Sequence, residues 1–125
     1  MNSKAHLDVA PDTSGKLLRL SFAGEVNGAD MQPYLAAVET ALQGLRPGFF
    51  LLTDLSGLRS MDLSCVPHIQ KTMNLLREHG VGRVVRIIPS PDQDIGFNLM
   101  SLFHYPRGVR TVTCENPAQA EQALK

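Results

Sequence analysis

Residues 49–67, FFLLTDLSGLRSMDLSCVP, join an apolar run to a polar segment and then to the start of a helix. The run 49–52 contains only Phe and Leu, which is typical of a parallel strand buried on both faces between helix layers. We expect this strand to end at Thr53 and Asp54, where polar residues begin, and a loop to lead to a helix that starts near Ser64. In open α/β sheets such strand ends carry the functional groups, so this segment is the first candidate site.

Strand and helix patterns alternate along the rest of the chain. Two extended segments on either side of the turn sequence PDTSG predict an N-terminal β-hairpin. Helical spacing of apolar residues, with Asp30, Ser64, Ser90 and Asn116 as expected N-caps, predicts four helices. The predicted strands are residues 6–10, 16–23, 49–52, 83–88 and 109–113, and the predicted helices are residues 30–45, 64–80, 90–105 and 116–124.

The resulting order, ββαβαβαβα, predicts a single α/β domain over residues 1–125. Strands that alternate with helices form parallel sheets with right-handed crossovers, and the hairpin adds an antiparallel strand. We therefore expect a mixed, mostly parallel sheet of about five strands with about four helices. A chain of 125 residues, 43% of them hydrophobic, buries a core that needs no metal or disulfide for stability.

Composition and charge argue against several classes of function. The formal net charge is zero at pH 7, whereas a nucleic-acid-binding domain is typically basic. Cys65 and Cys114 lie far apart and the histidines lack metal-ligand spacing, so no metal site and no cofactor is expected. The N-terminus carries no signal-peptide pattern, and no apolar run is long enough to cross a bilayer. We therefore expect a cytoplasmic protein without a transmembrane segment.

Ser64 is the expected N-cap of the second helix, because Pro67 then falls in the first turn, where its missing N–H costs least. A helix N-terminus carries partial positive charge and free N–H groups. A phosphate on Ser64 would be stabilised there and would change the surface charge by roughly −1.5 to −2 units. Ser64 is therefore a candidate phosphoacceptor.

Three segments, FFLLTDLSGLRSMDLSCV (49–66), GVGRVVRIIPSPD (80–92) and IGFNLMSLF (95–103), resemble the STAS domain, the fold of anti-sigma-factor antagonists. In that family a buried strand ends in Asp-Leu-Ser, and a loop leads to Asp-Ser-Ser-Gly at the start of a helix. Leu63 and Cys65 stand where the family pattern has its first serine and its glycine. The C-terminal stretch VRTVTCENPAQAEQAL is similar to SpoIIAA-like proteins of unassigned function.

The resemblance implies a small regulatory module that binds another protein and is controlled by phosphorylation of the serine before the helix, which is Ser64 here. The implied partner is an anti-sigma factor or a kinase-like regulator. The residues expected to contribute are Asp62, Leu63 and Cys65 on the partner surface and Asp54 and Ser56 in a supporting loop.

The predicted helix 90–105 carries Phe97 and Met100 outside its main apolar face of Ile95, Leu99 and Phe103. Apolar residues on two sides of a helix indicate an interface or deeper burial. We therefore add Phe97 and Met100 to the expected surface, where a protein partner, a second copy of the chain or a small ligand would bind.

Two catalytic hypotheses concern the same part of the chain. In the first, Asp54 and Asp62 bind a metal or accept a phosphoryl group, but the further acidic pair and the lysine of a receiver domain are not found. In the second, Cys65 and His68 form a nucleophilic pair, but no glycine pair for an oxyanion hole and no third orienting group accompany them. We therefore expect no enzyme activity. The alternative that stays open is a binder of a small apolar or anionic ligand in the strand-end crevice.

Overall fold

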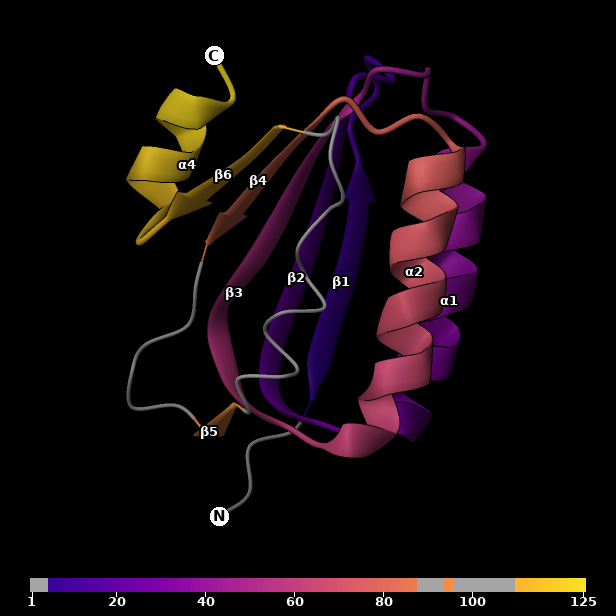
Figure 1. Ribbon diagram of the computed structural model, residues 1–125, viewed down its shortest axis with the longest axis vertical. Helices are drawn as coiled ribbons and strands as arrows, with labels where there is room; N and C mark the ends of the chain where they lie inside the picture. The colour runs from indigo at the N-terminus through magenta and orange to yellow at the C-terminus, as the bar shows by residue number, and fades with distance from the viewer. Residues whose placement is uncertain (1–4, 88–93, 96–109) are drawn as a thin grey trace.

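A single mixed sheet with helices on both faces organises the chain (Figure 1). The computed structural model describes residues 5–87, 94–95 and 110–125. The elements within these ranges are β1 (His6–Pro11), β2 (Leu17–Val26), α1 (Gly28–Leu42), β3 (Phe50–Met61), the 3-10 helix η1 (Leu63–Cys65), α2 (Val66–Glu78), β4 (Arg83–Ile87), β5 (Asp94–Ile95), β6 (Arg110–Cys114) and α4 (Pro117–Ala123).

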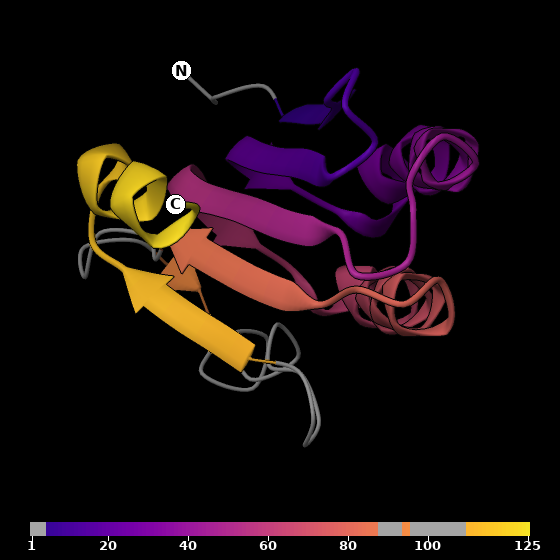
Figure 2. The same ribbon diagram turned by 90° about the horizontal axis from the view of Figure 1, so that it is seen from above.

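The sheet has the order β1-β2-β3-β4-β6, and β5 pairs with the far end of β3. β1 runs antiparallel to β2, and the pairs β2–β3, β3–β4 and β4–β6 are parallel. Figure 2 shows α1 and α2 side by side on one face and α4 on the other. The prediction of a mixed, mostly parallel sheet with an N-terminal hairpin is confirmed.

The side chains of β3 divide between two hydrophobic clusters, one on each face of the sheet. Leu51 belongs to the larger cluster, which includes buried residues of α1 and α2, whereas Leu52 packs with Val85 and Ala120 in the smaller cluster beneath α4. Successive residues of a strand point to opposite faces, so a run of apolar residues suits a strand covered on both sides. The prediction of a doubly buried strand in this segment is confirmed.

β3 is much longer than the sequence predicts. It continues through Asp54 to Met61, so Asp54 and Ser56 lie in a strand and the prediction of a supporting loop there is wrong. Ser21 pairs with Asp54 and Ala23 with Gly57, which leaves an extra residue in β3 at a bulge. The Asp54 Oδ1 accepts hydrogen bonds from the Ser56 N–H at 2.9 Å and the Ser56 hydroxyl at 2.6 Å. These bonds let polar residues occupy the strand.

The helix predicted at 90–105 is wrong at residues 94–95. Asp94 and Ile95 form the short strand β5, which pairs in parallel with Ser60 and Met61 at the end of β3. Because β3 extends so far, it offers free backbone groups to this segment, and strand pairing replaces the predicted helical turn. The rest of the predicted helix lies outside the described residues.

The N-caps of α1 and α4 are short polar residues, both asparagines. Asn27, rather than the predicted Asp30, caps α1, and Asp30 instead completes the capping box by accepting from the Asn27 N–H. Asn116 caps α4, as the sequence predicts, by accepting a hydrogen bond from the Gln119 N–H at 2.9 Å. Within the described residues, none of these helices is long and apolar enough to cross a membrane.

Replacing Asp54 tests the bulge in β3. Asp54→Ala removes the acceptor of two hydrogen bonds, and we expect the free energy of unfolding to fall by about 1 kcal/mol. Urea denaturation followed by circular dichroism measures this change. The control is Asp8→Ala on β1, where an exposed side chain is lost. Equal stability of the two variants would contradict a stabilising role for the Asp54 carboxylate.

Candidate functional site

The junction between β3 and α2 begins with a tight 3-10 turn rather than with an α-helical cap. Asp62 caps this turn by accepting a hydrogen bond from the Ser64 N–H at 2.9 Å, and the Val66 N–H donates to the Leu63 carbonyl. The prediction that Ser64 is the N-cap is therefore wrong. The turn satisfies the backbone ahead of Pro67, which lies near the start of α2 and has no N–H to donate.

The Ser64 hydroxyl connects the start of α2 to the start of α1. It donates to Asp62 Oδ1 and accepts a hydrogen bond from the Gly28 N–H, with a Gly28 N to Ser64 Oγ distance of 2.7 Å. Ser64 is nevertheless exposed as a residue. One hydroxyl is thus held between a carboxylate and one of the free N–H groups at a helix N-terminus, where an anion is also stabilised.

Gly28 lets the two helix starts approach each other closely. A Cβ on Gly28 would lie 2.5 Å from the Ser64 carbonyl oxygen and 3.0 Å from the Ser64 Cβ. Real Cβ atoms do not approach a backbone oxygen so closely, so any larger residue must push η1 away from α1. The short bond from Gly28 N to Ser64 Oγ depends on this contact.

Leu63 gives the junction its apolar character. Its side chain is 74% exposed, and it is the exposed large hydrophobic residue of the described part of the chain. Asp62 and Ser64, on either side of it in sequence, are also exposed. We call Asp62, Leu63 and Ser64 the junction surface. Two of the sequence-predicted surface residues, Asp62 and Leu63, therefore lie beside the candidate phosphoacceptor Ser64.

Cys65 does not belong to this surface, so the sequence prediction is wrong for this residue. Its side chain is fully buried in the larger core cluster, and its thiol lies 3.6 Å from the Val26 carbonyl oxygen, to which it donates. Burial is the main cause that raises the pKa of Cys65 to about 11, and the negative charge of Asp62 raises it further. The thiol is therefore protonated at neutral pH, when a nucleophile would need to be a thiolate.

The remaining predicted site residues do not come together with Ser64 in the described structure. Asp54 stands at the bulge of β3 and Asp62 follows the end of this strand, so eight positions of largely extended chain, roughly 25 Å, separate them. Within the described residues, no group of three or more His, Cys, Asp or Glu could hold a metal ion. Phe97 and Met100 lie outside the described residues.

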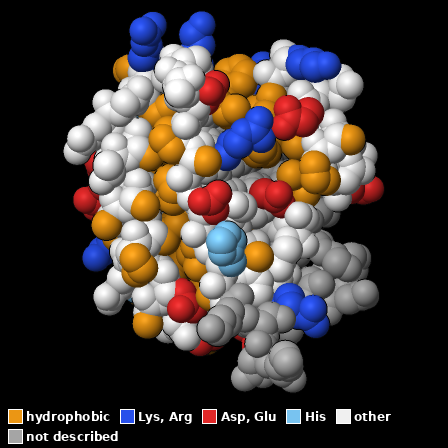
Figure 3. All heavy atoms as spheres, turned by 180° about the vertical axis from the view of Figure 1, so that it is seen from behind, with side chains coloured by type: hydrophobic (Ala, Val, Ile, Leu, Met, Phe, Trp, Pro, Cys, Tyr) orange, Lys and Arg blue, Asp and Glu red, His pale blue; other side chains and the backbone are white. Residues whose placement is uncertain are grey.

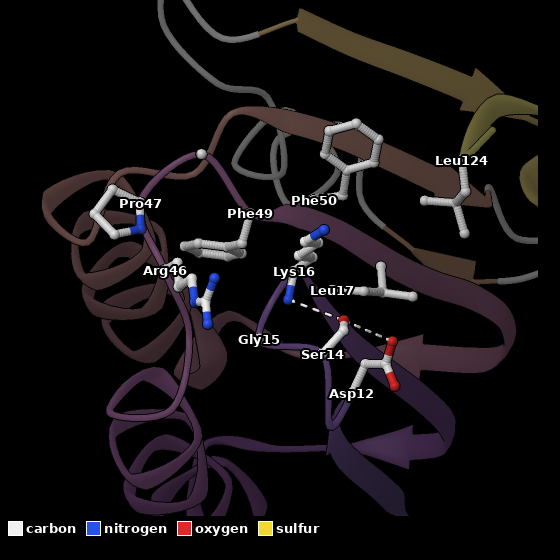
Figure 4. A pocket seen from close by; sticks show the side chains of 11 residues that line it. Asp12, Ser14, Gly15, Lys16, Leu17, Arg46, Pro47, Phe49, Phe50 and Leu124 are labelled. Carbon is white, nitrogen blue, oxygen red and sulfur yellow. Dashed lines mark hydrogen bonds between the residues drawn. The ribbon is translucent and has the colours of Figure 1, made fainter.

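The described structure contains two hollows that the sequence does not reveal. One, of about 560 Å³, lies between β1 and α1 and carries His6, Asp8 and Asp30. The other hollow, of about 460 Å³, lies at the opposite end of β3 from Ser64, between Lys16 and Arg46 (Figure 4).

Figure 3 shows the back of the molecule, where side chains of both charge signs are interspersed and do not gather into a basic patch among the described residues.

The close contact at Gly28 predicts an unusual effect of alanine. Alanine normally stabilises a helix by about 1 kcal/mol relative to glycine. Gly28→Ala should instead lower the free energy of unfolding by about 1–3 kcal/mol, because its Cβ collides with Ser64. The matched control is Gly44→Ala, whose Cβ meets only the Ala41 carbonyl oxygen at 3.8 Å. A Gly28→Ala protein as stable as the control in urea unfolding would show that the helix starts are not in contact.

Burial of Cys65 predicts a thiol that reacts slowly in the folded protein. In a Cys114→Ser variant, where Cys65 is the remaining cysteine, the thiol should react with a disulfide reagent at pH 8 far faster in urea than in the native state. Equal labelling rates with and without urea would contradict the buried position.

The same burial makes stability depend on pH. Since the pKa of the Cys65 thiol in the folded protein, about 11, lies above the ordinary 9.0, the contribution of this thiol to stability is full below pH 9 and is lost as the pH rises toward 11.

Comparison with solved structures identifies the fold but leaves the function open. An uncharacterized protein of the DUF3478 family from Shewanella loihica PV-4, described as having a SpoIIAA-like fold, matches at a TM-score of 0.64 with 19% sequence identity. The match covers 100% of this chain and 99% of the other. No family model and no curated protein matches the chain. The chain therefore has the SpoIIAA-like fold that its resemblance to STAS domains implied.

Proposed function

We propose that the protein is a non-enzymatic regulatory module that binds another protein through the junction surface. The observation that carries the proposal is the exposed Leu63, at 74%, immediately beside Ser64. Exposing a leucine side chain is unfavourable, and burying one contributes about 1.5–3 kcal/mol. A partner with an apolar pocket for Leu63 would gain this energy on binding.

The polar residues around Leu63 supply orientation. Asp62 and Ser64 present a carboxylate and a hydroxyl on the two sides of Leu63 in sequence, and both residues are exposed. Polar groups around an apolar anchor contribute specificity more than affinity. The proposed partner therefore offers an apolar pocket flanked by hydrogen-bond donors. In SpoIIAA-like terms it is an anti-sigma factor or a kinase-like regulator, and a second copy of the chain is an outcome that the experiment below distinguishes.

Phosphorylation of Ser64 would switch this surface. A phosphate on Oγ removes the proton that the hydroxyl donates to Asp62 and places at least one further negative charge beside that carboxylate. The Gly28 N–H favours the phosphate, whereas Asp62 repels it. Because the phosphate stays at the Gly28 N–H and repels Asp62, we expect the Asp62 side chain to be displaced and the 3-10 turn that it caps to loosen. Both changes alter the charge and the shape that a partner meets.

The chemistry of the described residues supports binding rather than catalysis. The Cys65 thiol is buried and its pKa is raised to about 11, so it does not serve as a thiolate nucleophile. Asp54 uses its carboxylate to hold the β3 bulge, and Asp62 uses its carboxylate to cap the 3-10 turn. Both carboxylates thus take part in structural hydrogen bonds.

Affinity capture from the native cell tests the proposal. The bait proteins are the wild type, Leu63→Asp, Ser64→Ala and Ser64→Asp, and the control is Gln122→Glu, which adds a remote negative charge on the exposed side of α4. We expect Leu63→Asp to weaken binding at least tenfold and Ser64→Asp to differ from Ser64→Ala, while the control binds as the wild type does.

The recovered partner is then purified, and its affinity for each variant is measured by calorimetry. Sedimentation of the chain alone shows whether the partner is a second copy. A partner that binds all five proteins equally would contradict the junction surface. A partner lost with Leu63→Asp but bound equally by both Ser64 variants would leave the surface in place and remove the switch.

A further inference from the structure

The pocket of about 460 Å³ at the far end of the sheet has the size and composition of a small-molecule site. Its walls come from the β1–β2 turn, from the segment that leads into β3 and from the end of α4. These segments lie at the top of Figure 1, and the junction surface lies at the bottom, with the twelve residues of β3 between them. The pocket is therefore separate from the proposed docking surface.

Backbone hydrogen bonds fix the two loops of the pocket to each other. The Arg46 N–H donates to the Gly15 carbonyl at 3.0 Å, and the Phe50 N–H donates to the Lys16 carbonyl at 2.8 Å. Gly15, at φ +73°, also packs closely against Gly44, because a Cβ at position 15 would lie 3.0 Å from the Gly44 carbonyl oxygen. A pocket whose walls are already ordered loses little conformational entropy when a ligand binds.

Cationic residues hold the third wall in place. The Arg83 guanidinium lies over the Phe50 ring, 4.8 Å from its centroid, and donates to the Ala123 carbonyl at 3.3 Å. The ion pair between Arg19 and Glu121, at 3.1 Å, ties α4 to β2 as well. These contacts keep Leu124, which follows α4, at the edge of the pocket. The apolar part of the pocket is thus built from three separate elements.

The pocket combines this apolar wall with two available cations. Leu17, Phe50 and Leu124 lie on one side of it, and the side chains of Lys16 and Arg46 extend beside Phe49 (Figure 4). Within the described part of the chain, neither of these two cationic side chains is held in an ion pair. Their charges are therefore free to meet an anion from solution.

Asp12 limits the charge of the anion that fits. Its carboxylate lines the same pocket, and Asp12 Oδ2 accepts a hydrogen bond from the Ser14 hydroxyl at 2.9 Å. Two cations and one carboxylate leave a single net positive charge, which favours a monoanion over a dianion. We propose that this pocket binds a small organic monoanion whose apolar body packs on Leu17, Phe50 and Leu124 and whose anionic group meets Lys16 and Arg46.

Fluorescence titration with 1-anilinonaphthalene-8-sulfonate, an aromatic monoanion, tests this proposal. We expect the full chain to bind the probe, and the double variant Lys16→Gln, Arg46→Gln to bind it about tenfold more weakly. The matched control is Arg59→Gln, which removes an exposed cation of β3, and Leu63→Asp checks the junction surface. Both should bind as the wild type does. Thermal unfolding of each variant establishes that it is folded.

Competition separates the roles of charge and apolar surface. Octanoate should displace the probe from the wild type, whereas octylammonium at the same concentration should not, because the two share a chain and differ in charge. Equal probe affinity in the wild type and the double variant would overturn the proposal. Equal displacement by octanoate and octylammonium would overturn it too, and loss of binding in Leu63→Asp would move the probe site to the other end of the sheet.

Discussion

The parallel pairing of β3 with β2 is the constraint that positions both ends of the molecule. It begins with Leu17 opposite Phe50, where the pocket lies, and ends with Val26 opposite Met61, just before the junction surface. Because β2 leads into α1 and β3 leads into η1, the same ladder brings the first turn of α1 against Ser64. A change of register along β3 would move both sites together, since each is built at one end of this pair.

The sequence predicts those features of the fold that depend on local pattern. The apolar pair Leu51 and Leu52 indicates a strand covered on both faces, and these residues do enter opposite clusters. Asn116 indicates the start of the last helix because its side chain needs only the next turn as a partner. The position at which β3 ends, in contrast, depends on a partner strand that is distant in the sequence. Polar Asp54 and Ser56 remain in the strand because a bulge against β2 accommodates them, and the partner strand cannot be seen in the segment itself.

The candidate site divides in the same way. Asp62 and Ser64 are both short polar residues that favour a helix start, and sequence pattern alone does not choose between them. The choice is made by Gly28, thirty-six positions away along the chain, because its N–H engages the Ser64 hydroxyl and leaves Asp62 to cap the turn. Lys16 and Arg46 illustrate the same limit, since their loops are joined by backbone bonds between distant residues, from the Arg46 N–H to the Gly15 carbonyl and from the Phe50 N–H to the Lys16 carbonyl. Leu63, in contrast, could be recognised in the sequence as a departure from the family pattern.

The hydrogen bonds of Ser64 define what the proposed phosphorylation would have to change. In an unoccupied helix N-terminus a phosphate would only add charge, and the backbone would stay as it is. Here the hydroxyl already donates to Asp62 and accepts from Gly28, so modification must break the first of these bonds before it strengthens the second. The cost is repulsion from Asp62, and the gain is a charge-assisted bond at the start of α1. The two energies oppose each other at the turn that also presents Leu63, so under the proposed function a change at one oxygen would reposition the apolar anchor of the proposed docking surface.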